Sequence, residues 1–292
     1  MTNEELIAKG LLCKVSVSMW GNTAKDKEES ERVRSANGAS EGSVRVNKTL
    51  LQSDKFKRLA ELVRDCRAEV YRSTLPWDDS GRRLCPVLAY NKLHAVVDDY
   101  RHKFDAMVKD IKDEYYNLVD AARVTLGQLF NADDYPSADE FACKFKFVWT
   151  AEPIPDPNDI RVSMPENEKK ALTESLKEQM RDNVSVAKKD IVERISDAVG
   201  HMVEKLSVFD PSKSGKERGT FRDTLVTNVT ELVDNLATLN FDNNQTVEDI
   251  RVKLMGALKD VSAKDLRESE DKRKNVLEEA KSVMFMLSDY GD

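Results

Sequence analysis

The apolar positions along the chain follow a helical period over most of its length. In six stretches, apolar side chains recur at steps of three and four residues, which is the spacing of one buried face of an α-helix. These stretches are 47–70, 87–130, 165–206, 221–239, 247–261 and 263–287. The pattern therefore predicts a mostly α-helical protein.

Two segments show the period of a β-strand instead. In residues 11–20, Cys13, Val15, Val17 and Met19 alternate with polar side chains, as in a half-buried strand. In the segment 144–164, alternating aromatic residues precede three prolines, and a second short strand is predicted at Ile160, Arg161 and Val162. We therefore expect a small β-sheet of two or three short strands.

The two longest helical stripes, 87–130 and 165–206, have matching lengths of roughly 60 Å. Because only the proline-rich β segment separates them, they predict a long antiparallel helical hairpin with coiled-coil packing. The alternative is that one or both break into shorter helices of a compact bundle, since ordinary helices are much shorter. The predicted fold class is mostly α: this hairpin, a helical bundle and the small sheet.

The predicted organisation has four parts. Residues 1–20 form an N-terminal helix and strand, and the polar stretch 21–46 forms a flexible loop in which a helix forms transiently. Residues 47–262 form the helical core, with the hairpin and the β segment at 144–164. A C-terminal helix covers 263–292.

The charge of the chain disfavours some classes of partner. With 46 basic and 53 acidic side chains, the net charge is −7 and the chain repels nucleic acid and anionic membranes. The start lacks the pattern of a signal peptide, no apolar run is long enough to span a membrane, and four scattered cysteines indicate free thiols. We therefore expect a cytoplasmic protein that does not bind membranes.

No catalytic or metal-binding pattern emerges from the sequence. His94 and His102 lie about 12 Å apart if they share a helix, which is too far to bind one metal ion. Asp210–Ser214 matches the metal motif of von Willebrand A domains but follows a helical stripe rather than a strand, and Gly215-Lys216 lacks the rest of a phosphate loop. We therefore expect no enzyme activity, no catalytic residue, no cofactor and no metal.

One loop gathers positive charge within this acidic chain. Lys213, Lys216, Arg218 and Arg222 fall within ten residues, just before a predicted helix. They are candidate contacts for an anion or a partner protein. The alternative is a solvated loop, because acidic residues are interspersed among them.

The stretch TLPWDDSGRRLCP, residues 74–86, is a predicted structural corner between two helices. Its prolines interrupt the helices, Trp77 supplies an apolar anchor, and Asp78 and Asp79 are typical turn residues. Arg82 and Arg83 can pair with these carboxylates. Adjacent carboxylates on one loop rarely face each other across a substrate, so we favour structure over catalysis here.

Several segments together resemble a family of uncharacterised phage and bacterial proteins that share a domain of unknown function. The resemblance covers roughly residues 11–258. It rests on Trp20-Gly21, LPWDDSGRRLCP at 75–86, LGQLFNADDYPS at 126–137, FKFVWTAEPIPDPNDIRV at 145–162 and FRDTLVTNVTELVDNLATLN at 221–240. Members of this family are often encoded beside a MoxR-type AAA ATPase and a von Willebrand A or cobaltochelatase-like protein.

The resemblance implies a non-enzymatic, helical phage-type accessory protein. We expect it to assemble with itself, with a MoxR-like AAA ATPase, or with the von Willebrand A-type adaptor of that ATPase, in the bacterial host cytoplasm if a phage encodes it. One alternative is a structural coiled-coil protein that oligomerises without an ATPase. A second is a nucleic-acid-binding protein that uses the basic loop 213–222, which the net charge disfavours.

Overall fold

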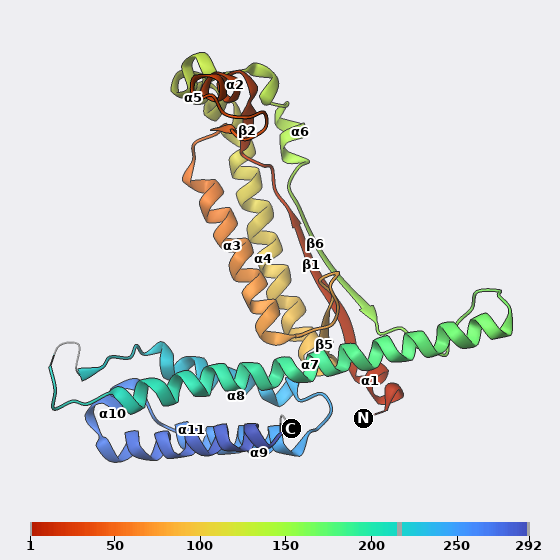
Figure 1. Ribbon diagram of the computed structural model, residues 1–292, viewed down its shortest axis with the longest axis vertical. Coiled ribbons are helices and arrows are strands. Elements are labelled where there is room, and N and C mark those ends of the chain that lie inside the picture. The colour runs from red at the N-terminus through yellow and green to blue at the C-terminus, as the bar shows by residue number, and fades with distance from the viewer. Residues whose placement is uncertain (1, 215–217, 291–292) are drawn as a thin grey trace. The chain divides into compact units, whose positions relative to one another are not determined.

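The computed structural model describes residues 2–214 and 218–290 of the chain (Figure 1). It is mostly helical with a small antiparallel sheet, so the coarse prediction of the fold class is confirmed. In chain order the elements are α1 (Asn3–Lys9), β1 (Gly10–Ser18), β2 (Thr23–Asp26), α2 (Lys27–Ala36), β3 (Val46–Thr49), α3 (Asp54–Ser73), β4 (Leu75–Pro76), β5 (Arg83–Pro86), α4 (Val87–Asp113), α5 (Tyr115–Leu126), two 3-10 turns (Gly127–Leu129 and Ala132–Asp134), α6 (Ala138–Ala142), β6 (Lys146–Pro153), α7 (Glu166–Val208), α8 (Thr224–Leu239), α9 (Gln245–Leu258), α10 (Ala263–Glu268) and α11 (Glu270–Tyr290).

The chain divides into two compact units, each with its own apolar core. The first unit comprises Met1–Lys14, Val70–Leu93 and Ala151–Asp292, and the second comprises Val15–Glu69 and His94–Thr150. The core of the first unit comes mainly from α7, α8, α9 and α11, with further side chains from α1, β1 and the β4–β5 hairpin. That of the second comes mainly from α3, α4, α5 and α6.

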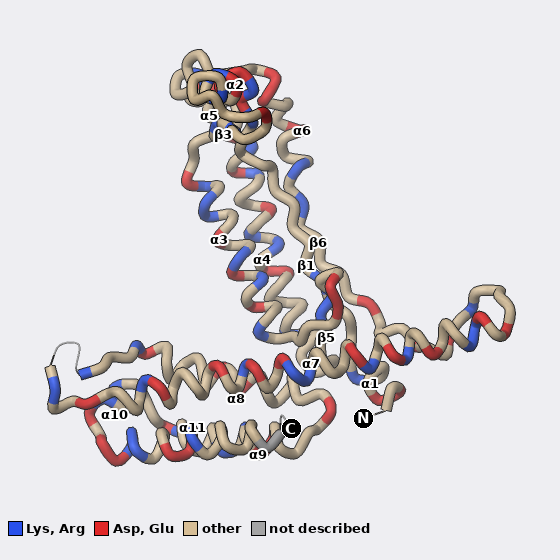
Figure 2. The backbone as a smooth tube through the Cα atoms, in the orientation of Figure 1, with Lys and Arg blue, Asp and Glu red and all other residues tan. Residues whose placement is uncertain are grey.

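In the first unit, α7 packs against α8 and α11, and α9 packs against the same two helices. The C-terminal two thirds of α7 supply one apolar stripe to this core because its apolar residues recur every three or four positions. The buried members are Met180, Ala187, Ile191, Ile195, Val199, Met202 and Leu206. Residues 166–179 contain no fully buried side chain, and both signs of charge are interspersed along α7 (Figure 2).

The predicted pairing of the 87–130 and 165–206 stripes is not confirmed. The second stripe is one continuous helix of 43 residues, but α8 and α11 pack against it. The first stripe is broken at Glu114, whose φ of −95° and ψ of 0° leave the helical region. The break lets Tyr115 enter the second core, where its ring centroid lies 4.5 Å from that of Phe141 and its hydroxyl donates to Pro136 O at 2.7 Å.

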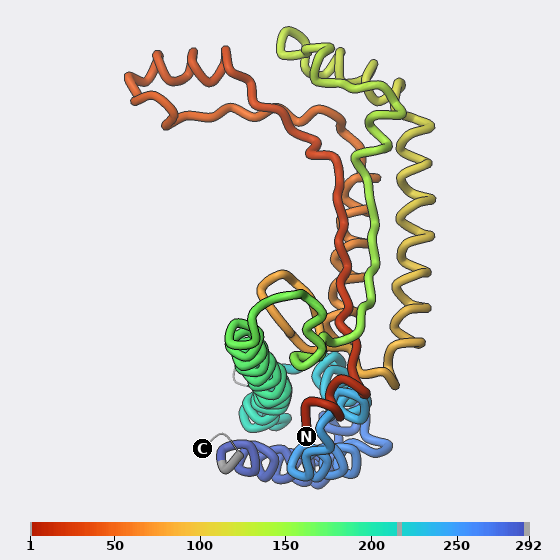
Figure 3. Tube along the Cα trace, turned by 90° about the vertical axis from the view of Figure 1, so that its right-hand side faces the viewer, coloured from red at the N-terminus to blue at the C-terminus, as the bar shows by residue number. Residues whose placement is uncertain are grey.

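The main sheet has four strands in the order β4-β5-β1-β6, which exceeds the predicted two or three. Strands β1 and β6 run side by side (Figure 3). Gly10 in β1 faces Pro86 in β5, and a Cβ there would lie 2.7 Å from the terminal side-chain atoms of both Leu84 and Ile154, so a larger residue would require these two side chains to shift. The strand predicted at 160–162 is absent, because prolines flank this segment and Arg161 pairs locally with Asp159 at 2.7 Å.

The polar stretch 21–46, predicted as a flexible loop, holds β2, α2 and the start of β3 in the structure. Asp26 caps α2 by accepting from the amide of Glu29 at 2.9 Å. Strands β2 and β3 pair antiparallel, and Lys48 of β3 lies 2.8 Å from Asp134 in the second unit. Local caps and ion pairs therefore give this stretch its secondary structure despite its few apolar residues.

Candidate functional site

The predicted corner is a tight β-hairpin formed by β4, β5 and the turn between them. Its backbone closes where Trp77 N donates to Arg82 O at 3.2 Å and Gly81 N donates to Asp78 O at 3.2 Å. Gly81 has a φ of +85°, a conformation that other residues rarely adopt. We call residues 74–86 the corner hairpin.

Asp78 organises the turn of the corner hairpin. Its Oδ1 accepts from the amide and the hydroxyl of Ser80 at 3.0 and 2.6 Å, and its Oδ2 accepts from Arg82 Nε at 2.6 Å. Burial alone would raise the pKa of this carboxyl, but the hydrogen bonds from Ser80 and Arg82 outweigh burial and lower it. Arg82 also donates to Glu152 at 3.2 Å, whereas Asp79 is exposed and has no hydrogen bond or ion pair within the described residues.

The second arginine of the corner hairpin turns toward α7. Arg83 donates to the hydroxyl and the carbonyl of the fully buried Thr74 at 2.7 and 3.0 Å, and its guanidinium lies 4.4 Å from the centroid of the Tyr71 ring. Arg194 of α7 donates to the same carbonyl at 2.8 Å and pairs with Asp190 at 2.7 Å. Burial lowers the pKa of Arg83 and raises that of Asp190.

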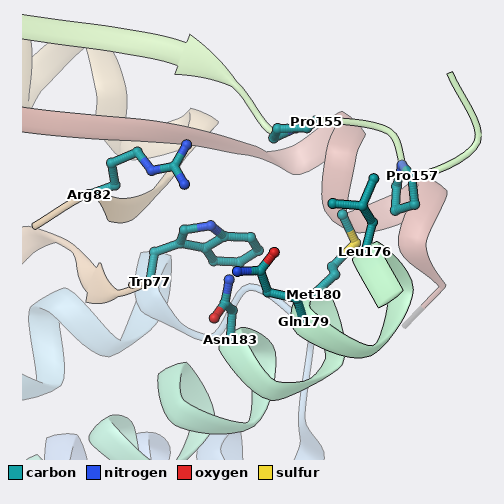
Figure 4. A pocket seen from close by; sticks show the side chains of 8 residues that line it. All are labelled: Trp77, Arg82, Pro155, Pro157, Leu176, Gln179, Met180 and Asn183. Carbon is teal, nitrogen blue, oxygen red and sulfur yellow. The ribbon is translucent and has the colours of Figure 1, made fainter. Parts of the chain in front are cut away.

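A small hollow lies beside Trp77, as Figure 4 shows. This corner pocket has a volume of about 70 Å³. Its lining residues are Trp77, Arg82, Pro155, Pro157, Leu176, Gln179, Met180 and Asn183. The space suits one small apolar side chain. Trp77 is 4% exposed and packs against apolar neighbours, and Arg82 already donates hydrogen bonds to Asp78 and Glu152.

A larger hollow runs between α7 and α8. Two pockets of about 470 and 350 Å³ share the lining residues His201, Leu225 and Asn228, so they adjoin, and together we call them the α7–α8 groove. Its lining residues are Arg72, Arg194, Asp197, Ala198, His201, Lys205, Thr220, Phe221, Arg222, Thr224, Leu225, Asn228, Glu231, Leu232 and Asn235. Along α8 it extends from Thr224 to Asn235, about 16 Å of helix.

The α7–α8 groove has an apolar floor and polar rims. Leu225 and Phe221, 5% and 8% exposed, lie in the floor with Leu232 and Ala198. The α7 rim presents residues at helical spacing, from Arg194 through Asp197 and His201 to Lys205, and the α8 rim presents Asn228, Glu231 and Asn235. A surface of this kind suits the side of an amphipathic helix.

The structure brings one member of the predicted basic cluster into the α7–α8 groove. Arg222 lines its end together with Lys205 and His201, two residues that sequence reasoning missed. Arg218 lies over the ring of Phe209, 5.5 Å from its centroid, and Lys213 is exposed. Lys216 lies outside the described residues, as do Gly215 and Glu217.

The signal for the missed residues was present in the sequence. Arg194, Asp197, His201 and Lys205 follow each other at steps of three or four, beside the apolar stripe of α7. Such a polar row marks the edge of a helix face that packs against a neighbour. Nothing in the sequence indicated which helix that neighbour is, so the packing of this row beside α8 could not be predicted.

Among the residues that the structure describes, no three histidine, cysteine or carboxylate side chains gather closely enough to hold a metal ion. The same part of the chain contains no helix with both the length and the apolar character needed to cross a membrane. Comparison of the chain with family models, with curated proteins and with solved structures gave no match.

Proposed function

We propose that this chain is a non-enzymatic helical accessory protein that acts by binding another protein in the α7–α8 groove. The groove itself is the observation that carries the proposal, because it joins an apolar floor to polar rims over about three helical turns. A surface of this length and character gives a partner both apolar contact area and specific polar contacts.

The occupant is a helical segment of the partner with one apolar face. Laid between α7 and α8, it would cover Ala198, Leu225 and Leu232 and face Asn228 and Asn235 with polar side chains. An extended peptide would leave its backbone donors unpaired against these two helices, since they offer no free strand edge. A helix satisfies its own backbone and presents only side chains.

Charge complementarity favours an acidic residue at one end of that segment. Among the residues that the structure describes, no carboxylate lines the end of the groove where Lys205 and Arg222 lie, whereas Asp197 and Glu231 accompany Arg72 and Arg194 at the other end. The family resemblance makes a MoxR-like ATPase or its von Willebrand A-type adaptor the first partner to test. A second copy of this chain, as in a coiled-coil oligomer, is the alternative occupant that the same experiment distinguishes.

The direct test is the affinity of the purified chain for the purified MoxR-like ATPase and for its adaptor, measured by biolayer interferometry. Asn228 lies where the two pockets of the groove meet, so Asn228→Arg fills the groove and adds a like charge near Arg194 and Lys205. We expect at least a tenfold loss of affinity. Thr227→Arg is the matched control, because Thr227 is also exposed but faces α10.

Equal binding by both variants and the unsubstituted chain would overturn the proposal. Light scattering over a concentration series completes the test. Self-association that Asn228→Arg abolishes and Thr227→Arg preserves would replace the ATPase by a second copy as the occupant. Absence of both the ATPase complex and self-association would count against an assembly role.

A further inference from the structure

The end of the α7–α8 groove nearest the last turns of α7 forms a distinct cationic pocket. Its volume is about 350 Å³, and the ring of Phe221 contributes to its floor. Its lining residues are His201, Lys205, Thr220, Phe221, Arg222, Thr224, Leu225 and Asn228. We call it the groove end. Every ionisable group in this set is basic.

The two described carboxylates next to groove-end residues in the chain, those of Glu204 and Asp223, already have partners. Glu204 pairs with Lys205 at 3.0 Å and lies 3.6 Å from His201, but it does not line the pocket. Asp223, the neighbour of Arg222 in the chain, is held by Arg267 at 2.6 Å. Within residues 2–214 and 218–290, the Arg222 side chain makes no hydrogen bond or ion pair.

Among the described residues, the guanidinium of Arg222 therefore has no acceptor, and the one carboxylate that pairs with the neighbouring Lys205, that of Glu204, is exposed to solvent. A guanidinium presents two parallel N–H groups that match the spacing of two oxygens on a carboxylate or phosphate. Thr220 and Thr224 add hydroxyl groups that can donate to a third oxygen. Partial enclosure by Phe221 and Leu225 reduces screening by water.

We propose that the groove end binds an oxyanion, a carboxylate or a phosphate group, with Arg222 as its main ligand and Lys205 as the second. The proposal rests on the proposed function only for the source of that oxyanion. If a partner helix occupies the α7–α8 groove, its terminal aspartate or glutamate supplies the group. A free phosphate-bearing molecule is the other source of the same chemistry.

The test uses the full chain and two small probes, inorganic phosphate and glutarate, titrated at constant ionic strength while amide NMR signals are followed. We expect saturable shifts at Phe221, Thr224 and Leu225 with at least one probe. Arg222→Gln combined with Lys205→Gln should raise the dissociation constant about tenfold or more, because each lost contact is a charge-assisted hydrogen bond. The matched control is Arg181→Gln combined with Lys189→Gln, two exposed positions elsewhere on α7.

Equal dissociation constants for the two double variants, or no saturable shift with either probe, would overturn the oxyanion site. Binding of glutarate points to a partner carboxylate, and binding of phosphate alone points to a phosphate-bearing molecule. The results for the oxyanion site and for the proposed function are independent of each other. If the groove end binds an anion but Asn228→Arg leaves the affinity for the ATPase unchanged, the proposed function is wrong and the oxyanion site stands.

Discussion

The corner hairpin and the groove end each contain arginine and an aromatic residue, yet their arginines have different partners. In the corner hairpin, Arg82 is paired with Asp78 and Glu152, and Arg83 donates twice to the buried Thr74. In the groove end, Arg222 has no partner within the described residues. The sequence marked the corner hairpin and the basic loop 213–222, which contains Arg222, as arginine-bearing loops.

A charge serves structure when it is paired within the fold and is available for binding when it is not. A guanidinium whose donors are all used within the fold contributes to stability, and removing it leaves buried acceptors unpaired. An exposed guanidinium without a partner contributes little to stability. Its donors remain available to a ligand.

The largest expected effect comes from the ring that anchors the corner hairpin. Trp77→Ala should lower the free energy of unfolding by about 3 kcal/mol or more, because the side chain is buried among Leu75, Leu84 and Met180 in the core of the first unit. Urea denaturation measures the change. Phe285→Ala is the control, since Phe285 is 68% exposed and should change stability by less than about 0.5 kcal/mol. Similar losses in both variants would show that Trp77 is no anchor.

A backbone position comes next. Gly219 has a φ of +69°, and a Cβ there would lie 2.9 Å from Val208 O. Gly219→Ala should therefore lower the free energy of unfolding by about 2 kcal/mol. Gly21→Ala serves as the control because nothing lies within 4 Å of a Cβ at that position. Thermal unfolding of the two variants makes the comparison. A stable Gly219→Ala protein would show that the chain around residue 219 relaxes freely.

The two adjacent aspartates of the corner hairpin separate an engaged carboxylate from a free one. Asp78→Asn should lower the free energy of unfolding by about 1 kcal/mol at pH 7, because Asp78 accepts hydrogen bonds from Ser80 and Arg82. Asp79→Asn should change the free energy of unfolding by less than about 0.5 kcal/mol. Since the folded protein lowers the pKa of Asp78, its contribution is present above the ordinary pKa near 4 and is lost as the pH falls through the folded pKa.

Urea denaturation at pH 7 and at pH 3 tests both parts of this prediction. The difference between the unsubstituted chain and Asp78→Asn should shrink at the lower pH. A difference that stays constant with pH would show that the carboxylate of Asp78 is not what holds the turn. A biological defect in a stable Asp79→Asn protein would instead place a functional site in the corner hairpin.

The smallest expected effect on stability belongs to the groove end. Arg222→Gln should change the free energy of unfolding by less than about 0.5 kcal/mol, because the side chain is exposed and unpaired within the described residues. The same variant should weaken binding of the partner or of the oxyanion, and the difference should fade in high salt as the charge is screened. A clear loss of stability would mean that Arg222 is engaged within the fold, as Arg82 and Arg83 are.

The sequence predicted local elements better than their partners. The stripe from Leu172 to Leu206 indicated a long helix, and α7 extends from Glu166 to Val208 with seven buried residues, all from Met180 onward. The same kind of stripe at 87–130 did not reveal the break at Glu114. The break is stabilised by the burial of Tyr115 against Phe141, a contact between residues distant in sequence. Apolar periodicity is local information, whereas packing partners are set by the whole fold.

The candidate site shows the same limit. Arg222 could be singled out because positive charge clusters in its loop, and Trp77 because prolines surround it. Lys205 and His201 could not be identified as site residues from the sequence. Their role depends on α8 lying beside them, and neither belongs to a charge cluster. The sheet pairing of β4, β5 and β1 was equally hidden, since β4 has only two residues and β5 only four.

Hydrogen–deuterium exchange of the chain, alone and with a MoxR-like ATPase or an adaptor as the proposed partner, shows whether a partner occupies the α7–α8 groove. We predict that binding slows exchange in 194–205 of α7 and 224–235 of α8, because an occupied α7–α8 groove opens less often. The corner hairpin should exchange slowly and equally in both states. Slowed exchange in the corner hairpin, with the two groove segments unchanged on binding, would contradict the account.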